Sequence, residues 1–254
     1  MKNLVFFFAL LCSTSLVAQF SFNENGTGIQ SSNSIASGDY SISLGVQTEA
    51  IGDIATAMGA ITTASGTNST AMGYDTNASA DYSTTMGYQT EASGNVSTAM
   101  GIGTTASGES SNAMGWNTSA SGNVSTAMGG YTTARGEYST AMGAETIAIG
   151  QFSTAMGSTS EASGIASTAI GDQVDATGNH STALGFYTSA SGHSSTALGF
   201  GSTASGKYGA TALGSHTIAR GHTSTAIGNY TTAEDIYSFI IGVHNKTDET
   251  PNPE

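Results

Sequence analysis

The chain has 254 residues, of which 9% are charged, and its formal net charge at pH 7 is −13. Soluble domains typically carry about 25% charged residues, so the composition excludes an ordinary globular domain. The acidic balance also excludes a nucleic-acid-binding protein, because such a surface repels phosphate groups and anionic lipid.

The first residues predict a secretory signal peptide over residues 1–18. Lys2 provides the positive start, an apolar run too short to span a bilayer follows, and Ala18 fits the cleavage site. We therefore expect an exported protein, extracellular or on the outer cell surface, with no transmembrane segment in the mature chain. Without residues 1–18 the chain has no cysteine, 4 basic and 18 acidic residues, and a formal charge of 4 − 18 = −14.

Residues 19–35 are expected to form an N-terminal lead-in or cap, after which the sequence repeats every 14 residues. Each repeat follows the pattern A-S-G-x-x-S-T-A-M-G-x-x-T-x, numbered here from the alanine at position 1. Fourteen repeats occupy residues 36–232, and the one that starts at Ala204 has 15 residues. A degenerate repeat at 233–245 and a polar tail or linker at 246–254 complete the chain.

Fourteen residues are too few for a helical hairpin, but they suit two short strands and two turns. Glycine at positions 3 and 10 is expected to allow a positive φ at each corner. One repeat cannot bury a core, so the repeats must stack on one another. The sequence therefore predicts an all-β protein, a parallel β-solenoid about 65–70 Å long at ~4.8 Å per coil.

Strand alternation decides which side chains face inward. The simplest arrangement places the small residues of positions 1, 6, 8 and 13 inside a narrow coil and the apolar residue of position 9 outside. The opposite arrangement, with methionine inside, stays open at this point. An outward apolar column needs a second subunit to cover it. The candidate trimer-interface residues are Met58, Met72, Met86, Met100, Met114, Met128, Met142, Met156, Ile170, Leu184 and Leu198.

The run STAMGxxTxASGxxSTAMG resembles the head repeat of YadA-like trimeric autotransporter adhesins, and the resemblance extends from Ala36 to about Gly242. It implies a left-handed parallel β-roll, a homotrimer, and a head that binds host, matrix or cell-surface ligands. It also implies that the protein is not an enzyme. That family continues into a stalk and a membrane β-barrel, which this sequence does not contain, so we expect either a fragment or a secreted head.

Variable positions are where ligand specificity is expected. Aromatic residues gather at positions 11 and 12, and the ligand-contact candidates are Tyr74, Tyr88, Trp116, Tyr131, Phe186 and Tyr187. The five histidines are read as exposed turn residues, so no metal site is expected. No catalytic constellation appears, and no catalytic residue or cofactor is expected. Expected partners are other copies of the chain and an extracellular matrix, glycan or cell-surface ligand.

Two other functions remain open. A structural fibre or spacer could present another domain without binding a ligand itself. An ice-binding solenoid could use the regular threonine rows at positions 7 and 13, although an inward position 13 argues against it.

Overall fold

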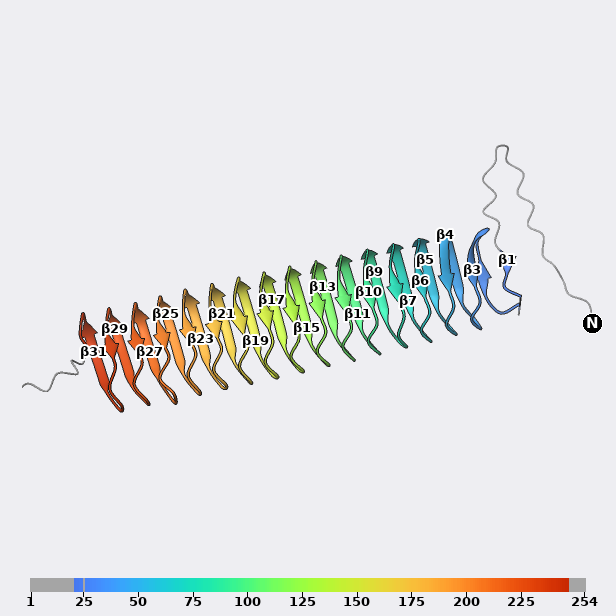
Figure 1. The fold of residues 1–254 in the computed structure, drawn as a ribbon. Coiled ribbons are helices and arrows are strands. Elements are labelled where there is room, and N and C mark those ends of the chain that lie inside the picture. Colours follow the sequence, from blue (N-terminus) through green and yellow to red (C-terminus); the bar gives the residue numbers. More distant parts are fainter. Residues whose placement is uncertain (1–20, 25, 247–254) are drawn as a thin grey trace, which may run out of the picture.

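The computed structural model of the chain describes residues 21–24 and 26–246, and these form a rod of stacked β-coils (Figure 1). Every coil-to-coil strand pairing is parallel, which confirms the predicted all-β parallel solenoid. The predicted signal peptide and residues 247–254 of the predicted tail lie outside the described residues.

Each regular coil contributes two strands, which stack into two columns along the rod. The long-strand column uses positions 7–11, and the short-strand column joins position 14 to position 1 of the next repeat. Strand β4 (Ile42–Ala50) bends through both columns, and β3 (Asn33–Ala36) pairs with it. The long strands that follow are β5 (Thr56–Ala60), β7 (Thr70–Tyr74), β9 (Thr84–Tyr88), β11 (Thr98–Ile102), β13 (Asn112–Trp116), β15 (Thr126–Gly130), β17 (Thr140–Ala144), β19 (Thr154–Ser158), β21 (Thr168–Asp172), β23 (Thr182–Phe186), β25 (Thr196–Phe200), β27 (Thr211–Ser215), β29 (Thr225–Asn229) and β31 (Phe239–Val243). The short strands are β6 (Thr63–Ala64), β8 (Asn77–Ala78), β10 (Glu91–Ala92), β12 (Thr105–Ala106), β14 (Ser119–Ala120), β16 (Thr133–Ala134), β18 (Ile147–Ala148), β20 (Glu161–Ala162), β22 (Asp175–Ala176), β24 (Ser189–Ala190), β26 (Thr203–Ala204), β28 (Ile218–Ala219) and β30 (Thr232–Ala233).

The pairing register follows the sequence repeat. Met100 pairs with Met114 and Ala106 with Ala120, so equal positions of neighbouring repeats lie beside each other. The 15-residue repeat keeps this register because its extra residue is absorbed in a turn, where His193 forms a bridge with Tyr208. Side chains of one kind therefore form straight columns along the rod.

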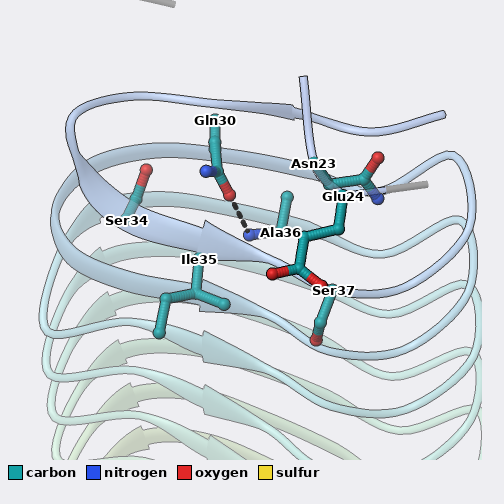
Figure 2. A pocket seen from close by; sticks show the side chains of 7 residues that line it. All are labelled: Asn23, Glu24, Gln30, Ser34, Ile35, Ala36 and Ser37. Carbon is teal, nitrogen blue, oxygen red and sulfur yellow. Dashed lines mark hydrogen bonds between the residues drawn. The ribbon is translucent and has the colours of Figure 1, made fainter. Parts of the chain in front are cut away.

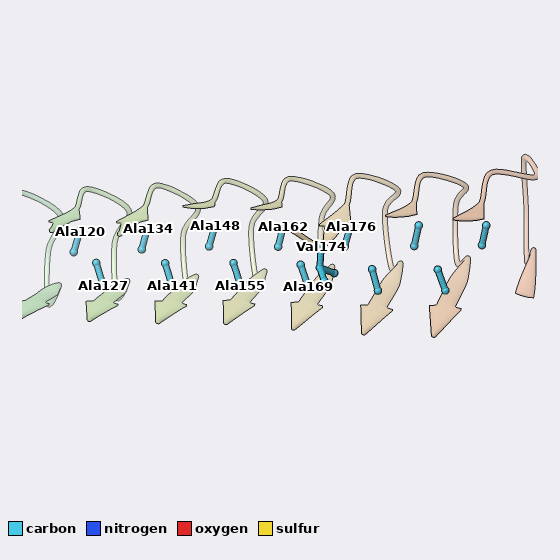
Figure 3. Close-up of a cluster of buried hydrophobic side chains, with 14 of the residues drawn as sticks. Ala120, Ala127, Ala134, Ala141, Ala148, Ala155, Ala162, Ala169, Val174 and Ala176 are labelled. Carbon is cyan, nitrogen blue, oxygen red and sulfur yellow. The ribbon is translucent and has the colours of Figure 1, made fainter. Parts of the chain in front are cut away.

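The interior of the rod is a thin core of small side chains. Alanines of positions 1 and 8 point toward one another from the two strand columns, as Ala127 and Ala134 do in Figure 3, and both are fully buried. Serine at position 6 and threonine at position 13 are buried beside them. The simpler of the two predicted arrangements is confirmed, and the alternative with methionine inside is wrong. Val174, which replaces a position-13 threonine, is the largest fully buried side chain.

Glycine is required at positions 3 and 10 for different reasons, which corrects the prediction that both positions need a positive φ. Position 10 does take a positive φ, as at Gly101 (φ 128°), but the regular position-3 glycines such as Gly94 do not. In both rows a Cβ would collide with the carbonyl oxygen of the equivalent glycine in the next coil. Close backbone approach between coils, and not turn conformation, therefore requires glycine at position 3.

The left-handed turn residues are mostly not glycine. Positions 5 and 12 adopt φ near +55°, including the β-branched Val96 (φ 60°) and Ile61 (φ 57°). The backbone amide at each of these positions donates to a carbonyl of the preceding coil, as Val96 N does to Asp81 O at 2.9 Å. These coil-to-coil hydrogen bonds hold a conformation that side chains with a Cβ rarely adopt. They also point the side chains of both turns away from the core.

The N-terminal end is closed by an irregular coil. Strand β1 (Ser21–Phe22) pairs antiparallel with β2 (Ile29–Gln30), which pairs with β4. Gln30 Oε1 accepts a hydrogen bond from Ala36 N at 3.0 Å, so a side chain satisfies a backbone amide at the end of the rod (Figure 2). The same region encloses a cavity of about 340 Å³ beside Asn23 and Ile35. The cap expected at residues 19–35 begins before the described residues and stays a prediction.

The C-terminal end uses larger side chains. Ile240 takes the inward position 8 of the last coil and packs against the alanine core without being fully covered. On the outer side of β31, Phe239 and Ile241 are 66% and 56% exposed. Asn245 Nδ2 donates to Ile241 O at 2.7 Å and satisfies a carbonyl of this last strand.

Candidate functional site

The predicted interface residues form one unbroken column on the outer face of the long strands. Met58 pairs with Met72, and the register continues through Met156 to Ile170 and Leu184. Their side chains are half-buried by their own neighbours, and Met86 is 38% exposed. The column begins at Leu44 and continues past the predicted residues to Ile241, so it has one apolar residue in every coil.

The two threonine rows are not equivalent. Position 13, for example Thr104 and Thr132, is fully buried, so this row presents no hydroxyls to solvent. Position 7, for example Thr98, is half-buried beside the apolar column. Neither row forms the open threonine face that an ice-binding surface needs.

The outer face of the short strands is mostly polar. Positions 14 and 2 contain mainly serine, threonine and charged side chains, and Glu161 lies beside Asp175 in the ladder. Isoleucine interrupts this face at residues 51, 147, 149 and 218. Partial burial against the neighbouring coils, together with the negative charge of Glu161, raises the pKa of Asp175 above its usual value. At the C-terminal end of this face, Glu234 forms ion pairs with Arg220 at 3.3 Å and with Lys246 at 3.5 Å.

The predicted ligand-contact aromatics lie on the second turn edge, which we define as positions 11 and 12. They form three separate clusters, and not one site. Tyr74 stacks on Tyr88 with ring centroids 5.3 Å apart and an interplanar angle of 7°. The ring centroids of Trp116 and Tyr131 are 4.8 Å apart, and those of Phe186 and Tyr187 are 4.2 Å apart.

Stacking changes what these rings can offer to a ligand. Tyr74 and Tyr88 cover each other's faces, yet each is 45% exposed, so they present ring edges and hydroxyl groups to solvent. Trp116 is 53% exposed and its ring is tilted by 58° against Tyr131. Edges and hydroxyls suit hydrogen-bond acceptors better than they suit the face of a sugar ring.

The third cluster continues to the end of the rod, beyond the residues predicted from the sequence. Phe186 stacks on Phe200, Phe200 contacts His216, and His216 stacks on Tyr230 at 4.6 Å and 1°. Tyr230 in turn stacks on His244 at 5.1 Å. Aligning the histidines and tyrosines by repeat position would have placed these residues on one edge.

A second ladder runs along the first turn edge, which we define as positions 4 and 5. It contains His180, His193, Tyr208, His222 and Tyr237, with successive ring centroids 5.3–6.0 Å apart. The histidines are therefore turn residues, as predicted, but they are not isolated. All five histidines of the chain belong to these two ladders, in the last five coils.

Charge divides the rod at the same place. Residues 21–175 contain 1 basic and 13 acidic residues, a formal charge of 1 − 13 = −12. Residues 176–246 contain 3 basic and 2 acidic residues, a formal charge of 3 − 2 = +1 with neutral histidines. All five histidines therefore lie at the end of the rod that lacks excess negative charge.

Within residues 21–24 and 26–246, no group of three or more histidine, cysteine, aspartate or glutamate side chains is arranged to hold a metal ion. The described part of the chain also has no helix long and apolar enough to cross a membrane.

Comparison with known proteins gives one clear match. A family model for the YadA head domain repeat matches the chain in overlapping segments that together cover most of residues 36–239. No curated protein matches the chain. The matched segments are 36–60, 64–90, 78–104, 92–118, 106–131, 120–146, 148–173, 176–202, 190–217, 208–231 and 219–239.

Proposed function

Because the chain belongs to the family of YadA head domain repeats, we propose that it is the head of an exported, trimeric, non-enzymatic adhesin. The trimer covers the apolar column, and the turn edges meet an extracellular matrix, glycan or cell-surface ligand. The family match supports this reading, because the matched repeats cover nearly all of the regular coils.

The apolar column of position 9 is the observation that carries the proposal. It places one apolar side chain in each coil from Leu44 to Ile241, in register and on one face. With about 4.8 Å between coils, the column is about 65–70 Å long. Soluble monomers rarely leave so long an apolar strip open to water. Packing columns of several copies together removes this surface from solvent.

The proposed ligand contacts lie on the two turn edges. Side chains at positions 4, 5, 11 and 12 point outward from the turns and vary from coil to coil, whereas positions 1, 3, 6, 8, 10 and 13 are fixed by the core and the close coil contacts. Recognition therefore spreads over many coils and over several copies of the chain, so that weak contacts add through multivalency.

The test couples assembly to adhesion. Beads coated with residues 19–254 are applied to cultured cells and to matrix-coated surfaces, and the bound fraction is counted. Met114→Glu places a charge in the column and is expected to lower both the trimer fraction and the fraction of attached beads. Ser119→Glu places the same charge on the polar short-strand face, where Glu91 and Glu161 occur naturally, and should preserve both.

The contrary results are distinct. Trimeric beads that attach to none of the surfaces would support a spacer instead of an adhesin. Attachment by a monomeric Met114→Glu chain would contradict the proposal that the trimer is the binding form.

A further inference from the structure

The first turn edge of the last coils gathers basic side chains, whereas residues 21–175 contain one basic residue, Arg135. We define the histidine edge as His180, His193, Lys207, Tyr208 and His222. His180, His193 and Lys207 are exposed, and His222 is half-buried. The four coils that start at Ala176, Ala190, Ala204 and Ala219 each contribute one basic side chain to this edge, so the spacing of these side chains follows the coil spacing of about 4.8 Å.

Local hydrogen bonds hold two of the imidazoles in defined orientations. His193 Nδ1 lies 2.9 Å from Ser194 Oγ, and His222 Nδ1 lies 2.9 Å from Thr223 Oγ1. When the hydroxyl donates to Nδ1, the proton of the neutral ring is on Nε2, which is then free to donate. A second proton leaves that Nε2–H in place and adds a positive charge. Each ring is therefore prepared to donate to an anion.

The surroundings of the histidine edge contain little negative charge. Lys207 Nζ lies 5.6 Å from the ring centroid of Tyr208, and Arg220 projects from the next coil. Positions 4 and 5 from Gln151 to Tyr237 contain no acidic residue. The acidic residues of the neighbouring coils lie at other positions: Asp172 on the second turn edge, Asp175 on the short-strand face, Glu234, which is paired with Arg220 and Lys246, and Asp235 one coil after His222. The coil before His180 has uncharged Ile165 and Ala166 in the equivalent turn.

We propose that the histidine edge binds a linear anionic polysaccharide, sulfated or carboxylated, and binds it more tightly in mildly acidic solution. The proposal rests on the proposed adhesin function and names its ligand class. A row of imidazole N–H donors with a lysine among them, one coil apart, matches a chain of regularly spaced anionic groups.

The rest of the rod favours a thin polymer over a broad anionic surface. Residues 21–175 carry a formal charge of −12, so a membrane or a duplex lying along the rod would meet strong repulsion. A single polysaccharide chain can follow the histidine edge and leave the acidic coils uncovered. Tyr208 and the hydroxyls of Ser194 and Thr223 offer further hydrogen bonds to sugar hydroxyls.

The opposite edge supplies a matched control. His216 and His244 also belong to an aromatic ladder in the same coils, but they flank Tyr230 with stacked ring faces, and positions 11 and 12 there contain no lysine or arginine. Removing two histidines from either edge changes the total charge of the chain equally. Only the loss from the histidine edge should affect polysaccharide binding.

The experiment measures binding of residues 19–254 to immobilised heparan sulfate by biolayer interferometry at about pH 5.5 and pH 7.5. Binding should be at least about tenfold tighter at the lower pH, and added salt should weaken it. His180→Gln with His193→Gln should remove most of this gain. His216→Gln with His244→Gln should stay within about twofold of the unmodified chain.

Equal affinity at the two pH values, or equal losses in the two double variants, would overturn the inference. Equally tight binding to single-stranded DNA or to anionic lipid vesicles would overturn the choice of polysaccharide. Light scattering on the same samples separates the two proposals. If a trimer attaches to cells but does not bind heparan sulfate, the proposed adhesin function stands and the inference about the polysaccharide is wrong.

Discussion

The ten coils before residue 176 and the five coils after it share one backbone but carry different surfaces. Position 9 is mostly methionine in the first region and leucine or isoleucine in the second. The first region has 13 of the 15 carboxylates among residues 21–246, and the second has every histidine. Both regions keep alanine at position 1 and glycine at position 10. Backbone geometry therefore fixes the repeat, and the turns are free to differ.

The largest expected effect concerns the shared backbone. Gly101→Ala and Gly185→Ala should each destabilise the chain by about 4 kcal/mol, because the new Cβ meets a carbonyl oxygen and φ is positive. The losses should be equal, since the two regions have the same coil geometry. Urea denaturation followed by circular dichroism measures them.

Gly130→Ala is the control for these two variants. A Cβ at Gly130 meets nothing within 4 Å, and its φ is not positive, so the change should be neutral or stabilising by up to about 1 kcal/mol. A similar loss at Gly130 and Gly101 would contradict the account of close coil contacts.

The second effect tests whether the apolar column is one interface across both regions. Met100→Glu and Leu184→Glu should each lower the trimer fraction, because each buries a charge between subunits. Sedimentation velocity measures the fraction over a concentration series. If only Met100→Glu lowers the trimer fraction, the interface ends with the methionine coils, and the C-terminal coils do not contact another subunit.

A smaller effect compares the aromatic ladders. Tyr230 stacks on both His216 and His244, whereas Tyr74 stacks only on Tyr88. Tyr230→Ala should therefore cost about 1–2 kcal/mol and Tyr74→Ala about 0.5–1 kcal/mol. Urea midpoints of the two variants give the comparison. The reverse order would mean that the stacked rings contribute little to stability.

The smallest effect lies at the boundary between the regions. The pKa of Asp175 is raised by partial burial and by Glu161, so the folded chain holds the proton at a higher pH than the unfolded chain does. Stability from this group is present at low pH and is lost as pH rises through the raised value. Asp175→Asn should therefore stabilise the chain at pH 7 by at most about 0.5 kcal/mol, after screening of an exposed group.

Low pH supplies the internal control for this variant. Near pH 3 the carboxyl is protonated, so Asp175→Asn should have no effect on the urea midpoint there. Asp172 lies in the same repeat, on the second turn edge. Asp172→Asn therefore tests whether the loss of any negative charge raises the stability at pH 7 equally. An equal gain at Asp172 would assign the effect to net charge and not to the Glu161 pair.

Much of the fold could be predicted because each position of the repeat has the same structural environment in every coil. The alternation of Thr98, Ala99 and Met100 put alanine and methionine on opposite faces and favoured alanine inside, and the full burial of Ala99 decides between the two arrangements. The cause of the position-3 glycines could not be predicted, because it lies in the distance between coils and not in local conformation. Positive φ at Val96 was likewise hidden, since hydrogen bonds to the preceding coil stabilise it.

The candidate site was predicted only in part. Single aromatics such as Tyr74 and Trp116 stood out by size, and the structure places them on the expected edge. The ladders at the C-terminal end could not be predicted from single residues, because each ring contacts a ring in the next coil and not a neighbour in the sequence. Tyr208 lies between His193 and His222 and contacts both rings, and these contacts follow only from the register of the stacked coils.

The proposed subunit interface along the position-9 column is tested most directly by the molar mass of residues 19–254 in solution. Size exclusion with multi-angle light scattering should give three times the mass of one chain, unchanged over a tenfold dilution. A stable monomer at all concentrations would contradict the account, because the column from Leu44 to Ile241 would then be exposed without a partner.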